Sequence, residues 1–249
     1  MDSKRKVVEY YDYTIPFYKV FWHKGTNALH YGIWDEHTKT LPEALLNTNK
    51  VMADTARIQL GDMVLDAGCG VGGSALWLAK HRGAHVVGIT ISEKQKDKAN
   101  TYAQRPGLQD KTEFFVRDFN NTGFADATFD VVWAIESVCH AERKADFLNE
   151  AFRILKPGGR IIVGDGFLRR TPGADREMRI YQEFCQGFAL DNLATVDSFS
   201  LDMHRAGFMR IEMHDMTARI AKPRHICIDS ASTGCGSIRR FDSFVSSRN

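Results

Sequence analysis

The stretch VLDAGCGVGG, residues 64–73, joins a short apolar run, an aspartate and four glycines. A glycine inside a strand or helix costs about 0.5–1 kcal/mol, because its backbone loses more freedom on folding than any other. A group of glycines is therefore not explained by stability of the fold. It indicates that a ligand or another part of the chain approaches the backbone closely. The apolar residues before the group predict a buried strand, and residues 74–82 have the spacing of a helix. The stretch thus predicts a ligand-binding loop between a strand and a helix.

The rest of the chain alternates short apolar runs with amphipathic segments. This alternation implies right-handed crossovers and a mainly parallel sheet that is covered on both faces. We therefore expect an α/β protein with a Rossmann-like, doubly wound fold, whose ligands bind beyond the carboxyl ends of the strands. The expected strands are 63–65, 85–89, 112–117, 129–134, 160–164 and 209–214; the expected helices are 74–82, 92–103 and 146–155, with a turn at 156–159.

Three segments are expected along the chain. Residues 1–55 are helical and rich in aromatic residues, and they form an N-terminal cover. Residues 56–220 form the ligand-binding core, in which 167–207 interrupts the alternation as an inserted substrate cover. Residues 221–249 contain a proline, two close glycines and many serines, and only 225–228 or 241–245 is a weak candidate for a last strand. We therefore expect the core to end near Thr217, followed by a divergent tail that is poorly ordered at least in part.

Composition narrows the class of protein. Lys and Arg number 33 and Asp and Glu 31, a net charge of +2, which argues against a nucleic-acid partner. The five cysteines include no Cys-x-x-Cys pair, so neither a zinc site nor a disulfide framework is indicated. With no signal peptide and no apolar run of membrane-spanning length, we expect a cytoplasmic protein without a membrane span or a metal.

The glycine loop also predicts the kind of ligand. Gly68, Gly70 and Gly73 satisfy the pattern G-x-G-x-x-G, which is shared with dinucleotide enzymes. Asp66, two residues before Gly68, is unusual in those enzymes and suits a positively charged amino group. The loop and the start of the next helix attract a carboxylate. A ligand with an ammonium group, a carboxylate and a ribose fits this arrangement, and S-adenosylmethionine is such a ligand.

The ordered motifs LDAGCGVGG, VVGITIS, VRDFNN, FDVVWAIESVCH, LKPGGRIIVGD and AGFMRIEMHD resemble the class I S-adenosylmethionine-dependent methyltransferases. The sequences GITIS, Glu-Ser-x-x-His and YYD…FY…FW…LHYGIWD are similar to one branch of them. That branch contains tocopherol and sterol C-methyltransferases, sarcosine-type N-methyltransferases and sugar O-methyltransferases. The resemblance implies a seven-stranded type of sheet, S-adenosylmethionine as cofactor, and a small-molecule acceptor methylated on O, N or C by a monomer or homodimer.

The cofactor residues are expected at the ends of successive strands. Many class I members grip the ribose with an acid at the end of the second strand; here Thr90 stands there, as in the named branch. Asp118 resembles the family's aspartate at the adenine amino group, although a strand-end turn is its ordinary alternative. The residues expected to bind the cofactor are Asp66, Gly68, Gly70, Gly72, Thr90, Ile91, Ser92, Gln95, Asp118, Phe119, Glu136, Tyr11 and Tyr18.

His140 is the first candidate for catalysis. It lies four residues after Glu136, so a helical turn places both on one side, and a neutral imidazole can take a proton from a hydroxyl or phenol. Asp165, at the end of the fifth strand, shares or orients this task; the resemblance to sugar O-methyltransferases implies a His and an Asp as bases. Glu136 is a third candidate. The alternative for His140 is a structural hydrogen bond.

The aromatic N-terminal segment is expected to contribute to the site, and two alternative functions remain open. Tyr11, Tyr18 and His30 are the residues expected to close over the cofactor, although such aromatic residues belong more often to a core. An NAD(P)-dependent oxidoreductase requires an acid or arginine in place of Thr90. A non-catalytic binding protein that retains the loop is the other alternative, and the intact loop with His140 argues against it.

Overall fold

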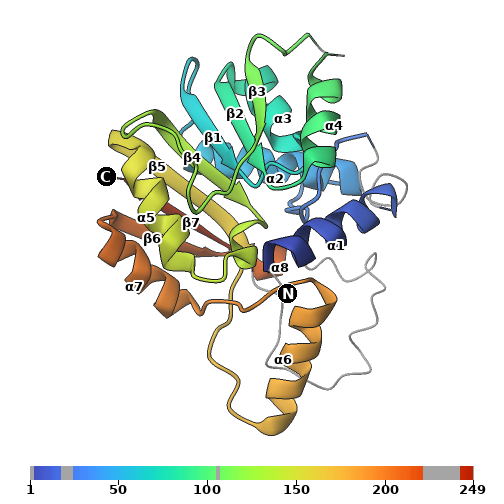
Figure 1. Ribbon diagram of the computed structural model, residues 1–249, viewed down its shortest axis with the longest axis vertical. Coiled ribbons are helices and arrows are strands. Elements are labelled where there is room, and N and C mark those ends of the chain that lie inside the picture. The colour runs from blue at the N-terminus through green and yellow to red at the C-terminus, as the bar shows by residue number, and fades with distance from the viewer. Residues whose placement is uncertain (1–2, 18–24, 105–106, 221–241, 249) are drawn as a thin grey trace.

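The computed structural model describes residues 3–17, 25–104, 107–220 and 242–248. They contain one seven-stranded sheet of order β3-β2-β1-β4-β5-β7-β6 (Figure 1). The first five strands pair in parallel, and β7 runs antiparallel between β5 and β6. The expected Rossmann-like, mainly parallel fold is thereby confirmed. The strands are β1 Met63–Ala67, β2 His85–Thr90, β3 Thr112–Val116, β4 Phe129–Ile135, β5 Leu155–Gly166, β6 Met209–Asp215 and β7 Asp242–Arg248.

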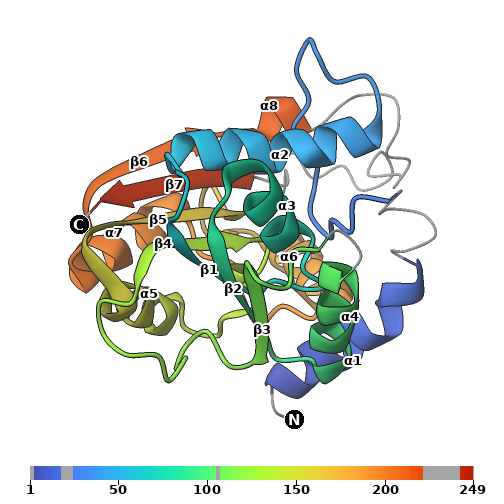
Figure 2. The ribbon, with the colours of Figure 1, turned by 90° about the horizontal axis from the view of Figure 1, so that it is seen from above.

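Helices cover both faces of this sheet (Figure 2). Met52 of α2, Leu78 of α3 and Ala99 of α4 belong to one buried apolar cluster, while Leu148 of α5 and Phe199 of α7 belong to the other. The helices are α1 Ser3–Phe17, α2 Leu41–Thr55, α3 Gly73–Arg82, α4 Glu93–Gln104, α5 Lys144–Ile154, α6 Asp175–Gly187, α7 Val196–Ala206 and α8 Thr217–Ile220, and a 3-10 turn, η2, spans Val138–His140. Among these described helices, none has the length and apolar character needed to cross a membrane.

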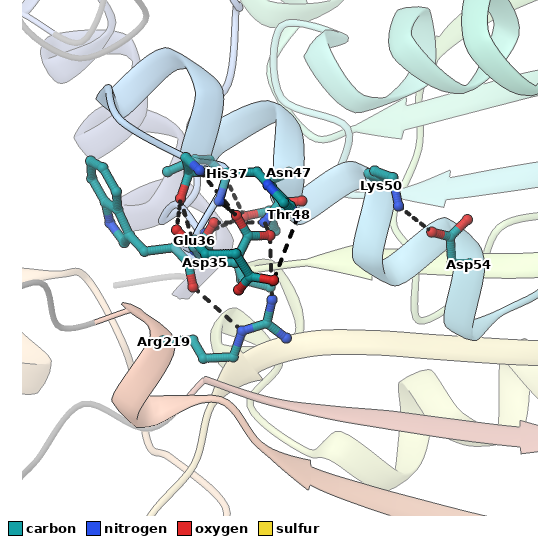
Figure 3. A network of polar contacts seen from close by, with 12 residues as sticks. Asp35, Glu36, His37, Asn47, Thr48, Lys50, Asp54 and Arg219 are labelled. Carbon is teal, nitrogen blue, oxygen red and sulfur yellow. Dashed lines mark hydrogen bonds and ion pairs between the residues drawn. The ribbon is translucent and has the colours of Figure 1, made fainter.

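A polar network fixes the segment that leads from α1 toward α2 (Figure 3). Asn47 Nδ2 of α2 donates to the Ile33 carbonyl at 3.0 Å and to Asp35 Oδ2 at 2.8 Å. The Trp34 backbone N–H donates to the Arg219 carbonyl of α8 at 2.8 Å, and the Arg219 guanidinium lies 3.7 Å from Asp35 Oδ2. These contacts anchor residues 33–35 to both α2 and α8.

The C-terminal expectation was wrong in one respect. The sheet does not end with β6, because Asp242–Arg248 forms β7 and pairs with both β5 and β6. The physical reason is that β7 satisfies the backbone groups of two neighbouring strands, which would otherwise have free edges. The core therefore extends past Thr217, and of the weak strand candidates 241–245 overlaps β7. Residues 221–241, including the other candidate, lie outside the described residues.

The structure also bears on two further expectations. The expected turn at 156–159 lies within β5 as an irregularity, since Phe129 pairs with Leu155 and Val131 next pairs with Arg160. The expected cover at 167–207 contains α6 and α7. Phe199 and Met203 of α7 are fully buried in the cluster that contains α5, so α7 is part of the ordinary helix layer.

Candidate functional site

A cavity of about 620 Å³ lies at the carboxyl ends of the parallel strands. Its walls come from α1, from residues 27–30, from the glycine loop after β1, and from the residues after β2, β3 and β4. The predicted residues that line it are Tyr11, Asp66, Gly68, Gly70, Thr90, Ile91, Ser92, Gln95, Asp118, Phe119, Glu136 and His140, and the suspected His30 lines it too. The fold thus brings most of the predicted site together around one space.

The glycine loop has conformations and contacts that exclude other residues. Gly68 has φ +89°, and a Cβ built on it lies 2.3 Å from the Cβ of Ser137, which follows β4. A Cβ on Gly73 lies 2.4 Å from the Asn27 carbonyl oxygen. Gly72, by contrast, is not part of the cavity wall: its φ is +84°, and it makes room for Ala99 of α4. The glycines therefore serve close approach on both sides of the loop.

Asp66 is the buried charge of the site. It is 2 % exposed at the end of β1, and burial raises the pKa of its carboxyl to about 7, while a hydrogen bond from the Ala75 N–H acts in the opposite direction. No described residue donates a hydrogen bond to Asp66 Oδ2. A buried acceptor without a donor is costly. The arrangement fits a ligand that brings an ammonium group to this carboxylate.

The residues after β2 form a hydrogen-bonded chain. Thr90 Oγ1 donates to Gln95 Oε1 at 2.6 Å, and Gln95 N donates to Ser92 Oγ at 3.2 Å. Ser92 Oγ in turn donates to Asp12 Oδ1 of α1 at 2.8 Å, and Lys94 lies 3.0 Å from the same carboxylate. Because the Thr90 hydroxyl is committed to Gln95, the amide nitrogen of Gln95 is the donor that this chain offers to a sugar hydroxyl.

The residues after β3 connect the cavity to α1. The Asp118 carboxylate accepts a hydrogen bond from the Asn120 N–H at 2.9 Å and forms an ion pair with Lys4 at 2.5 Å. Phe119 lines the cavity and packs edge-on against Phe147 of α5. Together with the Asp12 contacts, the Lys4 ion pair fastens α1 across the mouth of the cavity.

Glu136 holds the segment between α1 and α2. Its backbone has φ +47°, a left-handed conformation uncommon for a residue with a side chain. Its Oε1 accepts a hydrogen bond from the Tyr31 N–H at 2.6 Å. His30, which precedes Tyr31 in the sequence, is 5 % exposed, and burial lowers the pKa of its imidazole to about 4. Glu136 therefore joins the cavity wall after β4 to Tyr31, in the segment between α1 and α2.

His140 lies at the cavity wall in η2 and meets Tyr11 of α1. Tyr11 Oη and His140 Nε2 are 3.0 Å apart, and His140 Nδ1 lies 3.4 Å from the Ala189 carbonyl oxygen. A carbonyl only accepts, so the tautomer that satisfies both contacts has its proton on Nδ1 and an Nε2 that accepts from the tyrosine. Burial lowers the pKa of His140 to about 4. The imidazole is therefore neutral at pH 7, with its basic nitrogen toward Tyr11.

Asp165 lies apart from the cavity. Its carboxylate is 2 % exposed, and it accepts hydrogen bonds from the Cys139 N–H at 2.9 Å and from the Gly166 N–H at 2.8 Å. It is absent from the residues that line the cavity. In this arrangement its contact is with the backbone next to His140, and a role as base, as expected from the sequence, has no geometric support.

Some residues of the site were not expected. Asn27, Leu29 and Lys4 line the cavity, and Asp12 fastens α1 to it. The stretch LHYGIWD carried a signal for the covering segment, but nothing local distinguished Asp12 or Lys4 among the charged residues of α1. Tyr18, expected to bind the cofactor, lies outside the described residues.

Comparison with known proteins shows which protein family this chain is similar to. The model of a family described as methyltransferase domain matches residues 65–163. The methyltransferase GfsG of Streptomyces halstedii is 31% identical over 215 residues, which cover 86% of this chain and 76% of that protein. The 27-O-demethylrifamycin SV methyltransferase of Amycolatopsis mediterranei is 34% identical over 180 residues, 72% of this chain and 65% of that protein.

A solved structure agrees in fold. The geranyl diphosphate C-methyltransferase of Streptomyces coelicolor superposes with a TM-score of 0.82 at 20% identity, over 100% of this chain and 98% of that one. At this identity the likeness concerns the arrangement of helices and strands. The extent of the match to GfsG and the family match over the sheet carry the assignment: the chain belongs to the class I S-adenosylmethionine-dependent methyltransferases.

Proposed function

We propose that this enzyme transfers the methyl group of S-adenosylmethionine to a hydroxyl oxygen of an extended, largely apolar small molecule, with His140 as the general base. The observation that carries the proposal is the pair of Tyr11 and His140, 3.0 Å apart at the cavity wall. An oxygen acceptor must lose a proton near the transition state, whereas a neutral amine has a lone pair ready. A buried, neutral imidazole with an accepting Nε2 supplies the base that an oxygen acceptor needs and a neutral amine does not.

The cofactor is proposed to lie along the glycine loop. In this proposal Asp66 receives the ammonium group, Gln95 binds the ribose hydroxyls and Asp118 receives the adenine amino group; all three line the cavity. S-adenosylmethionine, when bound, supplies the methyl group on a positively charged sulfur. The chain itself supplies alignment and exclusion of water, and alignment alone is worth about 7–11 kcal/mol.

Closure by α1 supports water exclusion. Lys4 and Asp12 contact the residues after β3 and β2, and Tyr11 between them contacts His140. The contacts of Lys4 and Asp12, which lie before and after Tyr11 in α1, therefore hold Tyr11 above the cavity. In the proposed reaction Tyr11 either passes the acceptor's proton to Nε2 or gives up its hydrogen bond when the acceptor hydroxyl enters.

The proposed acceptor class follows from the wall and the relatives. Val7, Val8, Leu29 and Ile135 give the cavity apolar surface, beside polar and charged side chains that include His140. The rifamycin relative is named for an O-methyl transfer, and other relatives are named for sterol C-methyl transfer. A hydroxyl on a large apolar product of secondary metabolism is consistent with both the apolar surface and the base. Methyl transfer to carbon or nitrogen is the second candidate.

A methyl-transfer screen tests the proposal. The full chain is incubated with S-adenosylmethionine labelled in the methyl group and a library that contains macrocyclic alcohols, sterols, phenols, sugars and amines, and products are read by mass spectrometry. Labelled methyl ethers from apolar alcohols or phenols are the expected result. Products methylated only on nitrogen, or binding of S-adenosylhomocysteine without transfer to any class, would contradict it.

A further prediction concerns Asp66 and pH. Asp66→Asn is expected to weaken binding of S-adenosylhomocysteine more than tenfold, because the ligand's buried ammonium loses its counter-ion. In the unmodified protein, binding is expected to release a proton below pH 7 and to tighten as pH rises to about 7, since the bound ammonium favours ionised Asp66, whose pKa is otherwise about 7. Calorimetry in buffers of different ionisation enthalpy measures both.

The same group gives the sign of a stability change. An acid whose pKa is about 7 in the folded state and 3.8 otherwise opposes folding once the unfolded chain ionises. Without ligand, the contribution of Asp66 therefore reduces stability between pH 4 and 7, by about 4 kcal/mol at most. Asp66→Asn should remove this pH dependence from the free energy of unfolding. Equal affinity and equal pH dependence in the variant would refute the assignment.

A further inference from the structure

Lys144, the first residue of α5, is a buried cation. It is 7 % exposed, and burial lowers the pKa of its ammonium. Nζ donates to the carbonyls of Cys139 at 3.0 Å, Ala141 at 2.6 Å and Asn192 at 2.9 Å. An ammonium group has three donors, so all of them are used on backbone. Burying a charge is costly, and the three hydrogen bonds offset this cost. They also fix three peptide groups in place.

The three carbonyls belong to the two segments that hold His140. Cys139 and Ala141 are the residues on either side of His140. Asn192 lies three residues after Ala189, whose carbonyl accepts from His140 Nδ1. A second tie joins the same segments, because Asn192 Nδ2 donates to the Glu142 carbonyl at 2.8 Å.

Asp165 acts on the same loop from the opposite direction. Its Oδ2 accepts from the Cys139 N–H at 2.9 Å, while the Cys139 carbonyl accepts from Lys144. The backbone before His140 is thus held by a buried carboxylate and a buried ammonium. This accounts for two charged residues that do not themselves form the wall of the main cavity.

The hydrogen bond that fixes the His140 tautomer is long. Its 3.4 Å between Nδ1 and the Ala189 oxygen lies beyond the usual 2.7–3.2 Å, so a small separation of the two segments breaks it. Without it, Nδ1 has no fixed partner, and the proton is free to move to Nε2. The accepting nitrogen would then become a donor, and it could no longer receive a proton.

We propose that Lys144 is a positioning residue for methyl transfer: by joining the His140 loop to residues 189–192, it keeps the proton of His140 on Nδ1 and leaves Nε2 able to accept one. The proposal rests on the proposed function of His140 as base. It assigns Lys144 a task that is separate from contact with the cofactor or acceptor.

The first readout of the test follows the tautomer directly and requires no acceptor, whereas the second is turnover with an acceptor from the screen. Full-length protein labelled with nitrogen-15 in histidine is studied by NMR with bound S-adenosylhomocysteine, and the His140 signals are identified by their loss in His140→Gln. In Lys144→Met, the Nδ1–H form is expected to lose its dominance. Turnover is expected to fall about 10²-fold in kcat with little change in KM, as for a displaced catalytic group. Lys50→Met, on an exposed face of α2, is the matched control.

The pH titration of His140 gives a second readout. The groups that face it are Tyr11 of α1, Lys144 of α5 and Asp191 between α6 and α7. Burial is the main cause of the low pKa of His140, and the charge of Lys144 acts in the same direction. The pKa is therefore expected to rise in Lys144→Met, whereas Lys144→Arg, which keeps a charged donor, should restore part of both readouts.

Two other variants keep the outcome decisive. If Lys144→Met does not fold, Lys144→Gln replaces it; it removes the charge and at least one of the three hydrogen bonds, so a smaller shift in the same direction is expected. Asn192→Ala removes only the second tie and should shift the tautomer in the same direction by less. An unchanged tautomer and unchanged kcat in every folded variant would overturn the proposal. Failure of the proposed function is recognised separately, as normal turnover in His140→Gln despite a shifted tautomer in the Lys144 variants.

Discussion

His140→Gln is expected to lower turnover by about 10²–10⁴-fold, the usual contribution of a general base, while affinity for S-adenosylhomocysteine changes only a few-fold. The reason is that the imidazole faces Tyr11 with an accepting Nε2, whereas the ammonium of the cofactor is assigned to Asp66. Steady-state kinetics with an acceptor from the screen, together with calorimetry, measure the two quantities. The exposed His85→Gln, at the start of β2, is the matched control.

The pH profile sharpens this prediction. Because the pKa of His140 is about 4, its base form persists down to that pH, and the decline of kcat attributable to it should occur as pH falls through about 4. Tyr11→Phe distinguishes the two roles of the tyrosine: a loss as large as that of His140→Gln indicates a proton relay, and a small loss indicates orientation. Lost cofactor affinity with normal turnover at saturation would show that His140 is structural.

Gly68→Ala is expected to weaken S-adenosylhomocysteine binding about 10²-fold or more and to destabilise the fold. A Cβ at this position meets the Ser137 Cβ at 2.3 Å, so the loop must move away from Ser137 and its N–H groups leave the positions from which they meet the ligand. The residue also has φ +89°, where a side chain costs about 1–2 kcal/mol.

Gly61→Ala is the matched control for this variant. Gly61 has a similar φ, +83°, but a Cβ there has nothing within 4 Å. It should show the backbone cost alone, seen as a lower Tm with unchanged affinity. Thermal unfolding and calorimetry on both variants separate the two effects. Equal loss of Tm with retained ligand affinity in Gly68→Ala would mean that the contact with Ser137 does not define the site.

Much of the fold and of the cofactor half of the site follows from local patterns. Short apolar runs and helical spacing predicted β1 to β6 and α3 to α5, because burial on both faces of a parallel sheet requires such runs. The glycines of residues 68–73 and the aspartate before them predicted the loop. His140 was expected from its spacing to Glu136, and both line the cavity.

Other features depend on contacts between neighbouring strands, which no local pattern predicts. Asp165 has the residue type and strand-end position of a base, yet its carboxylate faces the Cys139 backbone. The strand β7 has only two adjacent apolar residues, Phe244 and Val245, so no alternation marks it. Its position follows instead from pairing with β5 and β6.

The sequence by itself determined the order of β1 to β6 and of α3 to α5 along the chain, the glycine loop with Asp66, and the candidacy of His140, since each depends on residues within one or two turns of chain. Tertiary structure alone decided that Tyr11 meets His140, that Tyr31 binds Glu136, and that Lys144 joins two loops. These partners are far apart in sequence, and hydrogen bonds between them need distances near 3 Å. Packing of the whole core sets such distances, and no local pattern encodes them.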